Sequence, residues 1–231
     1  MRRAAGAHEL LDGAVSAPDL ARTLADIERL DTWFGGHALS LARVRRVARA
    51  MPRERTLRVI DVGGGGGGFA RRVAEWGRRH HRHVSVVLVD RDAATSALAR
   101  RACAAYPEIH VVRADATALP FGVASADVVH SALTLHHLEP DSAVTALAEM
   151  GAVARVSVVI NDLARTRVAL ALVWLATRLL TMHPISRHDG PLSVRRAYRP
   201  DELADLFRKA GLPGVSVRRY RALARVVAET A

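Results

Sequence analysis

The chain has 231 residues, half of them hydrophobic, and a single cysteine, Cys103. This length suffices for one domain with a buried core, and one cysteine excludes an internal disulfide framework and a thiolate metal cluster. The formal net charge of +11 suggests a polyanionic partner. However, Lys209 is the only lysine and the arginines are scattered along the chain, a compositional bias that makes nucleic-acid binding the weaker interpretation.

Neither a secretion signal nor a membrane span is predicted. The start, MRRAAGAHELLDG, has no apolar core of signal-peptide length. The most apolar stretch, residues 168–180, is shorter than the roughly 20 residues that span a bilayer and contains Arg178. We therefore expect a cytoplasmic protein, with a buried or lid helix over 168–180.

Two helices are predicted at the N-terminus. Residues 17–36 and 37–51 each carry leucine, isoleucine or valine at helical spacing, with Gly35 and Gly36 between them. Neither belongs to a repeating strand and helix unit. We expect residues 1–52 to form a helical appendage or lid on a main domain formed by residues 53–231.

From Thr56 onward, apolar strand-like runs alternate with helical ones. The runs are residues 57–62, 84–90, 109–115, 126–132 and 154–162, and the helices between them are 69–79, 92–106 and 141–153. Strands that are apolar at nearly every position and separated by helices predict a parallel sheet covered on both faces. After a helix over 200–211, the runs 215–223 and 224–230 follow without a helix between them. The fold class predicted is α/β: a Rossmann-like, doubly wound seven-stranded sheet with a C-terminal antiparallel strand pair.

Six consecutive glycines, residues 63–68, follow the first strand. In an open α/β sheet, the ligand lies outside the carboxyl ends of the strands, and glycines there let the backbone approach it closely. A glycine run matches G-x-G-x-x-G trivially, so the match itself says little. Asp61, two places before the first glycine, would repel the pyrophosphate of a dinucleotide and suits a ligand with a positive group.

Two further acids end strands. Asp90 ends the second strand, where a carboxylate can accept hydrogen bonds from both ribose hydroxyls. Asp115 follows the third strand, where it can accept from the exocyclic amino group of adenine. A cationic end, a ribose and an adenine together describe S-adenosylmethionine.

From about Leu57 to its end, the chain resembles the class I S-adenosylmethionine-dependent methyltransferases. The motifs that carry the resemblance are DVGGGGG, VLVDRD, RADATALPF and ADVVHSALTLHHL, together with the closing strand pair. The resemblance implies S-adenosylmethionine as methyl donor and S-adenosylhomocysteine as product. The cofactor-binding residues that it implies are Asp61, Gly63 and Gly65 at the methionine end, Asp90 at the ribose, Arg91, Asp115 and Ala116 at the adenine, and Ser131 beneath the sulfonium.

The LTLHHL stretch and the N-terminal helices are similar to the branch that methylates quinones and small aromatic or polyketide metabolites in secondary metabolism. The NPPY motif of many nucleic-acid and glutamine N-methyltransferases is absent, because HSAL follows the fourth strand. We therefore expect a small apolar acceptor, with O-methylation favoured over C-methylation.

A phenol or enol acceptor needs a base, and histidine is suited to that role near neutral pH. His136 and His137 directly follow the fourth strand; their alternative role is loop packing. A second candidate pair is His188 with Asp189, in a lid insertion at about 165–199. Residues 182–196 of this insertion are interpreted as a functional loop, with an exposed turn at His188 and Asp189 as the alternative.

The acceptor pocket is expected to have an apolar roof. Its candidate residues are Trp33, Phe34, Asn161, Trp174 and Arg195. Asp162 either contacts the acceptor or caps the next helix, and core packing is the alternative for the apolar stripe. The histidine-rich run 78–83 is interpreted as a solvated loop, so no metal site is predicted.

Three rival functions are kept open. The charge favours an RNA or other nucleic-acid methyltransferase, and a methyltransferase-like subunit without turnover would bind cofactor or a partner alone. Nicotinamide-dependent oxidoreduction is disfavoured by Asp61 and the terminal strand pair. The oligomeric state is open, a homodimer included.

Overall fold

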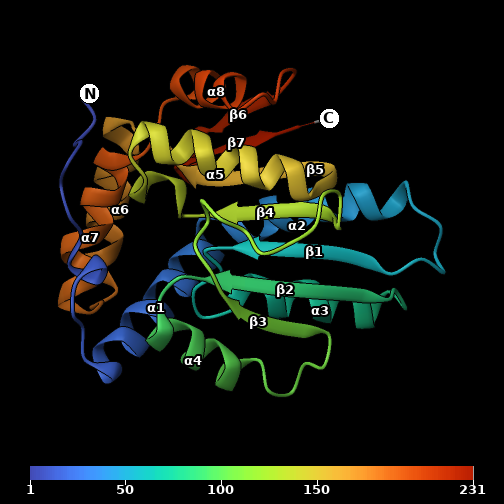
Figure 1. Cartoon of the computed structure of the whole chain (residues 1–231). Coiled ribbons are helices and arrows are strands. Elements are labelled where there is room, and N and C mark those ends of the chain that lie inside the picture. Colours follow the sequence, from blue (N-terminus) through green and yellow to red (C-terminus); the bar gives the residue numbers. More distant parts are fainter. Residues whose placement is uncertain (231) are drawn as a thin grey trace.

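The computed structural model describes residues 1–230, and over that range it contains one seven-stranded sheet in the order β3-β2-β1-β4-β5-β7-β6. The strands are β1 (Leu57–Val62), β2 (Val84–Asp90), β3 (Ile109–Arg113), β4 (Ala126–Ala132), β5 (Ala154–Leu163), β6 (Ser216–Tyr220) and β7 (Arg225–Glu229). Strands β1 to β5 are parallel, and β7 runs antiparallel to both β5 and β6 (Figure 1). The predicted Rossmann-like fold with its closing antiparallel pair is confirmed.

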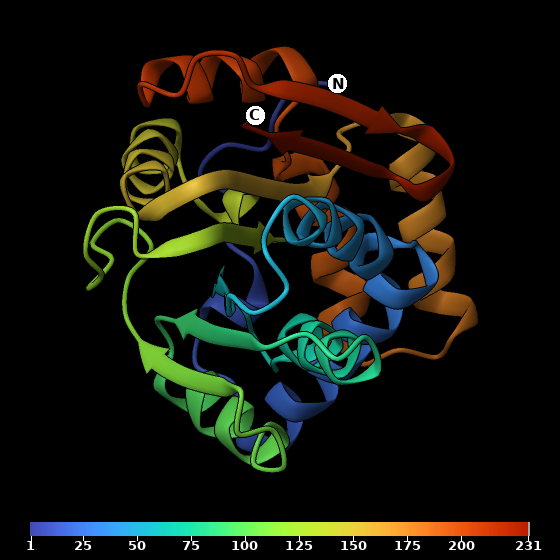
Figure 2. The same cartoon turned by 90° about the vertical axis from the view of Figure 1, so that its right-hand side faces the viewer.

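Helices cover both faces of the sheet. One face carries α2 (Gly36–Arg49), α3 (Gly68–Arg79) and α4 (Ala93–Ala102), and the other carries α5 (Pro140–Val153) and α8 (Pro200–Lys209). In Figure 2, α2 and α3 lie on one side of the sheet and α5 on the other. Val59 and Ile60 are neighbours in β1, yet they enter opposite cores because successive side chains of a strand alternate. This explains why the strands are apolar at almost every position.

The second N-terminal helix, α2, packs directly on the sheet. It contacts β4 and β5, and the Asn161 side-chain amide donates to the carbonyl of Gly36 at 2.8 Å and to Ser40 Oγ at 2.9 Å. The part of the N-terminus that lies away from the sheet is therefore α1 (Ala17–Trp33) with the segment before it, which includes a 3-10 turn, η1 (Leu10–Asp12).

Two helices follow β5 at the carboxyl edge of the sheet, α6 (Arg167–Leu179) and α7 (Pro184–Arg196). They stand beside α1 in Figure 1, and the N-terminal segment runs past them. The interpretation of residues 182–196 as a loop is wrong, because these residues are largely helical. Pro191 removes one hydrogen-bond donor inside α7, but Asp26 Oδ2 accepts from the backbone of His183 at 2.7 Å and from Ser186 Oγ at 2.9 Å. These tertiary contacts stabilise a helix that its own sequence does not predict.

Within residues 1–230, none of the helices is both long and apolar enough to cross a membrane. The predicted apolar helix over 168–180 corresponds to α6, which buries Ala169, Val173 and Thr177.

Candidate functional site

A cavity of about 740 Å³ opens at the carboxyl edge of the sheet. Its floor is the glycine loop after β1, its roof is α1, and its side walls come from the ends of β2 and β4, the N-terminal segment, α6 and α7. Pockets for small ligands commonly measure 300–1,000 Å³. The cavity therefore has room for a ligand of cofactor size with part of a second molecule.

Glycine is required in the floor of this cavity. Gly63 has φ +69°, a conformation that residues with a Cβ rarely adopt, and a Cβ there would lie 2.1 Å from Thr134 Oγ1. The amides of Gly63 and Gly64 donate to the carbonyl of Val89 at 2.8 and 3.1 Å. The loop is thus fixed between β2 and the segment after β4.

Helix α1 is tied down onto the glycine loop. The Arg71 guanidinium pairs with Glu28 of α1 at 2.8 Å and donates to the carbonyl of Gly66 at 2.8 Å. The apolar face of α1, which includes Leu20 and Leu24, lines the cavity. The helical face that the sequence marks as apolar is therefore the roof of the ligand site.

Asp61 lies in the cavity wall, and one of its two carboxylate oxygens has no hydrogen-bond partner within residues 1–230. Its Oδ1 is 2.8 Å from His130 Nδ1, and His130 Nε2 is 2.8 Å from Ser40 Oγ. Asp61 Oδ2 is buried and has no hydrogen-bond partner among the described residues. A buried carboxylate oxygen without a donor is costly, so this oxygen suits a bound ammonium group.

The two other acids also reach the cavity. Asp90 accepts from the amide of Gly65 at 3.1 Å and from that of Asp92 at 3.0 Å, and burial raises its pKa. Asp115 accepts from the hydroxyl and amide of Thr117 at 2.6 and 2.8 Å, which lowers its pKa. The remaining cofactor candidates in the lining are Gly63, Gly65, Arg91 and Ala116.

Ser131 is the cofactor candidate that lies outside the cavity lining. The strand alternation explains this, because His130 and Ala132 of β4 line the cavity and Ser131 between them points to the other face. Thr134 and Leu133 occupy the wall at that point. Any contribution of Ser131 to binding would have to come from its backbone.

His136 and His137 follow β4 in a 3-10 turn, η2 (Leu135–His137), and both line the cavity. His136 is buried, with Nδ1 2.6 Å from Asp162 Oδ1, and its amide donates to Asp162 Oδ2 at 3.1 Å. Burial alone would raise the pKa of Asp162, but His136 outweighs it and the pKa is lowered. His137 Nδ1 is 3.1 Å from Asp12 Oδ1. Each histidine is thus held by a carboxylate through the same ring nitrogen.

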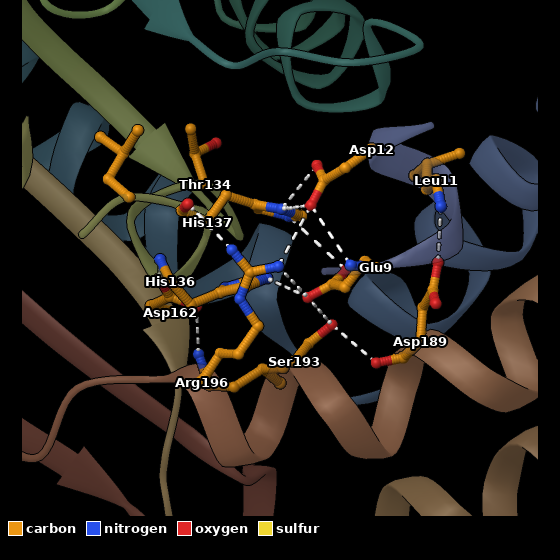
Figure 3. Close-up of polar contacts among 12 residues, drawn as sticks. Glu9, Leu11, Asp12, Thr134, His136, His137, Asp162, Asp189, Ser193 and Arg196 are labelled. Atoms are coloured by element: carbon orange, nitrogen blue, oxygen red, sulfur yellow. Dashed lines mark hydrogen bonds and ion pairs between the residues drawn. The ribbon is translucent and has the colours of Figure 1, made fainter. Parts of the chain in front are cut away.

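A buried polar cluster completes this wall with residues that the sequence analysis missed (Figure 3). Glu9, only 5% exposed, accepts from Ser193 Oγ at 3.0 Å, and burial raises its pKa to about 7. Arg196 donates to Asp12 Oδ2 at 3.1 Å and to the carbonyl of His137 at 2.9 Å. Burial opposes ionisation of Asp12, but His137 and Arg196 outweigh it and lower its pKa.

Sequence patterns gave no signal for this cluster. Glu9 and Ser193 are 184 positions apart, and the N-terminal segment has no regular period that would place its acids. Glu9 and Asp12 lie in HELLDG, shortly after the basic start of the sequence. Acids near basic residues are too common in sequences to predict a site.

The other candidate pair, His188 and Asp189, lies outside the cavity lining. The His188 side chain is 53% exposed, with Nδ1 2.7 Å from Asp189 Oδ1. Asp189 is buried and accepts from the amides of Leu10 and Leu11, each at 2.9 Å. The alternative of an exposed turn is wrong for Asp189, which instead fixes the N-terminal segment onto α7.

Among the acceptor candidates, Phe34 lines the cavity. Trp33 is 60% exposed, and Trp174 is 49% exposed beneath the guanidinium of Arg178. Asn161 joins α2 to β5, as described above, and Arg195 is exposed while its neighbour Arg196 enters the polar cluster. The structure therefore brings together Phe34, His136 and His137 and leaves the other four acceptor candidates outside the lining.

Known proteins share this architecture. Residues 59–157 match a family model described as a methyltransferase domain. The citrinin polyketide synthase CMeT domain is similar with a TM-score of 0.58 at 13% identity, over 76% of this chain and 46% of that one. A SAM-dependent methyltransferase from Aquifex aeolicus has a TM-score of 0.56 at 17% identity, over 81% and 88% of the two chains. The CurJ carbon methyltransferase has a TM-score of 0.60 at 16% identity, over 80% and 51%.

The chain spans about half the length of the first and third of these structures. No match was found among curated protein sequences. At these identities the structural likeness establishes the fold, and the family match concerns residues 59–157. The glycine floor and the unpartnered oxygen of Asp61 fit the methionine end of the cofactor. Together with the methyltransferase-domain match over residues 59–157 and the observed sheet order, they point to S-adenosylmethionine as the methyl donor.

Proposed function

We propose that the protein methylates an oxygen of a small apolar acceptor, of aromatic, quinone or polyketide-like chemistry, that binds beside His136. The observation that carries this proposal is the His136–Asp162 pair in the cavity wall, with Nδ1 and Oδ1 2.6 Å apart. Apolar residues make up much of the rest of the wall. They include Leu20, Leu24, Ile27, Phe34, Leu133 and Val173.

The His136–Asp162 pair is suited to removing a proton. S-adenosylmethionine, when bound, supplies an already activated methyl group, so the protein mainly aligns the acceptor and excludes water. A carboxylate that accepts Nδ1–H leaves Nε2 of the same ring with its lone pair. His136 Nε2 then takes the proton of a phenol or enol, and Asp162 stabilises the imidazolium that results.

The acceptor class is supported by the walls of the cavity and by the similar structures. Two of those structures are described by name as carbon-methylating or polyketide-synthase domains. A carbon beside a carbonyl also needs a base before it can be methylated, so the same pair would serve C-methylation. Carbon transfer is therefore the second candidate reaction.

The test begins with calorimetric titration of S-adenosylmethionine, followed by turnover with a panel of phenols, hydroquinones and enolisable ketones. Mass spectrometry of the products detects the added methyl group, and carbon NMR separates O-methyl from C-methyl products. In His136→Gln, we expect kcat to fall by about 10²–10⁴-fold with cofactor affinity unchanged. His110→Gln, at an exposed position, is the matched control. Full activity in His136→Gln would refute the role of this residue.

The rivals predict different results. An RNA methyltransferase would bind RNA with a steep loss of affinity as salt is added and would methylate it. A subunit without turnover would bind S-adenosylmethionine and give no product from any acceptor. Either result would replace the function proposed here.

A further inference from the structure

Three side chains in the cavity wall have the composition of a metal site. Glu9, His136 and His137 each offer one ligand atom, and these atoms all lie within 4.8 Å of one another. Glu9 Oε1 is 3.7 Å from His136 Nε2, and Glu9 Oε2 is 3.8 Å from His137 Nε2. Tetrahedral zinc with ligands at about 2.0–2.2 Å holds them roughly 3.4 Å apart. The two Glu9–histidine distances exceed this by a few tenths of an ångström, and the widest separation in the triad exceeds it by at most about 1.4 Å.

Both histidines are oriented as metal ligands usually are. Nδ1 of His136 faces Asp162 and Nδ1 of His137 faces Asp12, so the two Nε2 atoms are the ones turned toward Glu9 (Figure 3). Metal-binding histidines almost always donate their other ring N–H to a carboxylate, a carbonyl or water, which fixes the tautomer and the ring orientation. Here both rings have such a carboxylate partner.

The charges in the cluster also favour a cation. The carboxyls of Glu9, Asp12 and Asp162 lie around the two histidines. Arg196 reaches Asp12 at 3.1 Å and Glu9 at 3.6 Å, and Arg91 reaches Asp12 at 3.8 Å. Buried carboxylates are costly unless they are paired or coordinate a metal. Two guanidiniums for three carboxyls, both of them at Asp12, leave Glu9 and Asp162 short of positive charge and favour a cation between the histidines and Glu9. A proton on Glu9 is the alternative way to balance the same charges.

We propose that Glu9, His136 and His137 bind one divalent transition-metal ion and leave its remaining coordination positions open toward the cavity. Two imidazoles and one carboxylate suit zinc, iron and cobalt better than magnesium or calcium. The site would bind this ion whatever reaction the protein catalyses. The role that we give the ion in the reaction rests on the methyl transfer proposed above.

The ion would change how the acceptor loses its proton. An acceptor hydroxyl that binds the ion is acidified and releases its proton to solvent. The resulting oxygen anion forms a bond to the methyl carbon, and the electron pair of the broken carbon–sulfur bond stays on sulfur. His136 would then act as a metal ligand and not as the base.

The test uses the full chain, freed of metal by dialysis against a chelator. We expect calorimetric titration with Zn²⁺ to show one ion per chain, and Co²⁺ to give the visible absorption of a site with nitrogen and oxygen ligands. Glu9→Gln and His137→Gln should each weaken binding at least tenfold. Glu9→Gln preserves the buried shape, and His137 is only partly buried, so at least the second variant should fold.

The histidine-rich run 78–83 provides the control. A triple variant, His80→Gln with His81→Gln and His83→Gln, removes that run and should keep the stoichiometry and affinity of the intact protein. The proposal is overturned if the intact protein binds no stoichiometric ion, or if the triple variant loses the ion and Glu9→Gln keeps it. Ion binding without methylation of any acceptor would refute the proposed function alone. Methylation unaffected by chelation, in protein that contains no metal, would refute the role of the ion in proton loss and leave His136 as the base.

Discussion

The two ends of the cavity are assembled in different ways. At the cofactor end, each residue follows directly from a strand: the glycine loop from β1, Asp90 from β2 and Asp115 soon after β3. At the acceptor end, the residues of one polar cluster come from four separate segments. They are Glu9 of the N-terminal segment, His136 of η2, Asp162 of β5 and Arg196 of α7. A site built at strand ends is fixed by the fold itself. A site drawn from four separate segments depends on how those segments pack.

The largest effect is expected at the cofactor end. Asp90→Ala should abolish detectable binding of S-adenosylmethionine, because it removes the predicted ribose contact and frees the amide of Gly65 that Asp90 accepts from at 3.1 Å. Calorimetric titration measures this, with thermal unfolding to show that the variant is folded. Unchanged affinity would remove the ribose assignment.

The next effect separates the two ends. Asp162→Asn should lower kcat by about 10²–10⁴-fold, because an amide no longer holds His136 in the tautomer with a free Nε2. Cofactor affinity should stay the same, since Asp162 lies at the acceptor end. A parallel loss of cofactor affinity would mean that the two ends are not separable.

A matched pair of arginines tests how the acceptor end is held together. Arg196→Met should cost about 3–5 kcal/mol of unfolding free energy, because it leaves the buried carboxyl of Glu9 and the carbonyl of His137 without their guanidinium. Arg195→Met changes the exposed neighbour and should stay within about 0.5 kcal/mol. Urea denaturation of both variants gives the comparison, and equal stabilities would show that the cluster contributes nothing to the fold.

The smallest effect is a pH dependence of stability that comes from Asp31, another residue of the cavity wall. Burial opposes ionisation of Asp31, but Arg225 and His37 outweigh it and set its pKa at about 2, below the ordinary 3.8. A lowered pKa stabilises the folded state above the unfolded value, by about 2 kcal/mol here. This contribution should be lost as the pH falls from about 4 to 2. Urea denaturation of the intact protein and of Asp31→Asn across that range measures their free energies of unfolding. The difference between the two free energies should narrow as the pH falls, and a constant difference would contradict the assignment.

The sequence allowed prediction of the sheet, its closing pair and the meeting of the glycine loop, Asp90 and Asp115 at one cavity, because strand periodicity and the residues at strand ends are local signals. It did not allow prediction of α7, whose Pro191 and Gly190 are unfavourable in a helix and which is stabilised by Asp26 from another helix. Nor did it allow prediction of Glu9 and Arg196, since only the packing of α7 against the N-terminal segment brings them to His136 and His137. For the same reason, Arg195 was selected as an acceptor contact in place of Arg196, which faces the cluster.

The N-terminal segment also bears on the order in which the chain folds. Arg3 and Glu9 are made long before their partners, because Arg3 bonds to Arg196 and Glu9 to Ser193, at separations of 193 and 184 positions. Contacts of such long range carry a large entropic cost of loop closure and form late. During synthesis, Arg3 and Glu9 must therefore wait until Ser193 and Arg196 have left the ribosome before they can dock. The parallel strands β1 to β5 can pair in that interval, so we expect the cofactor end to form before the acceptor end closes over it.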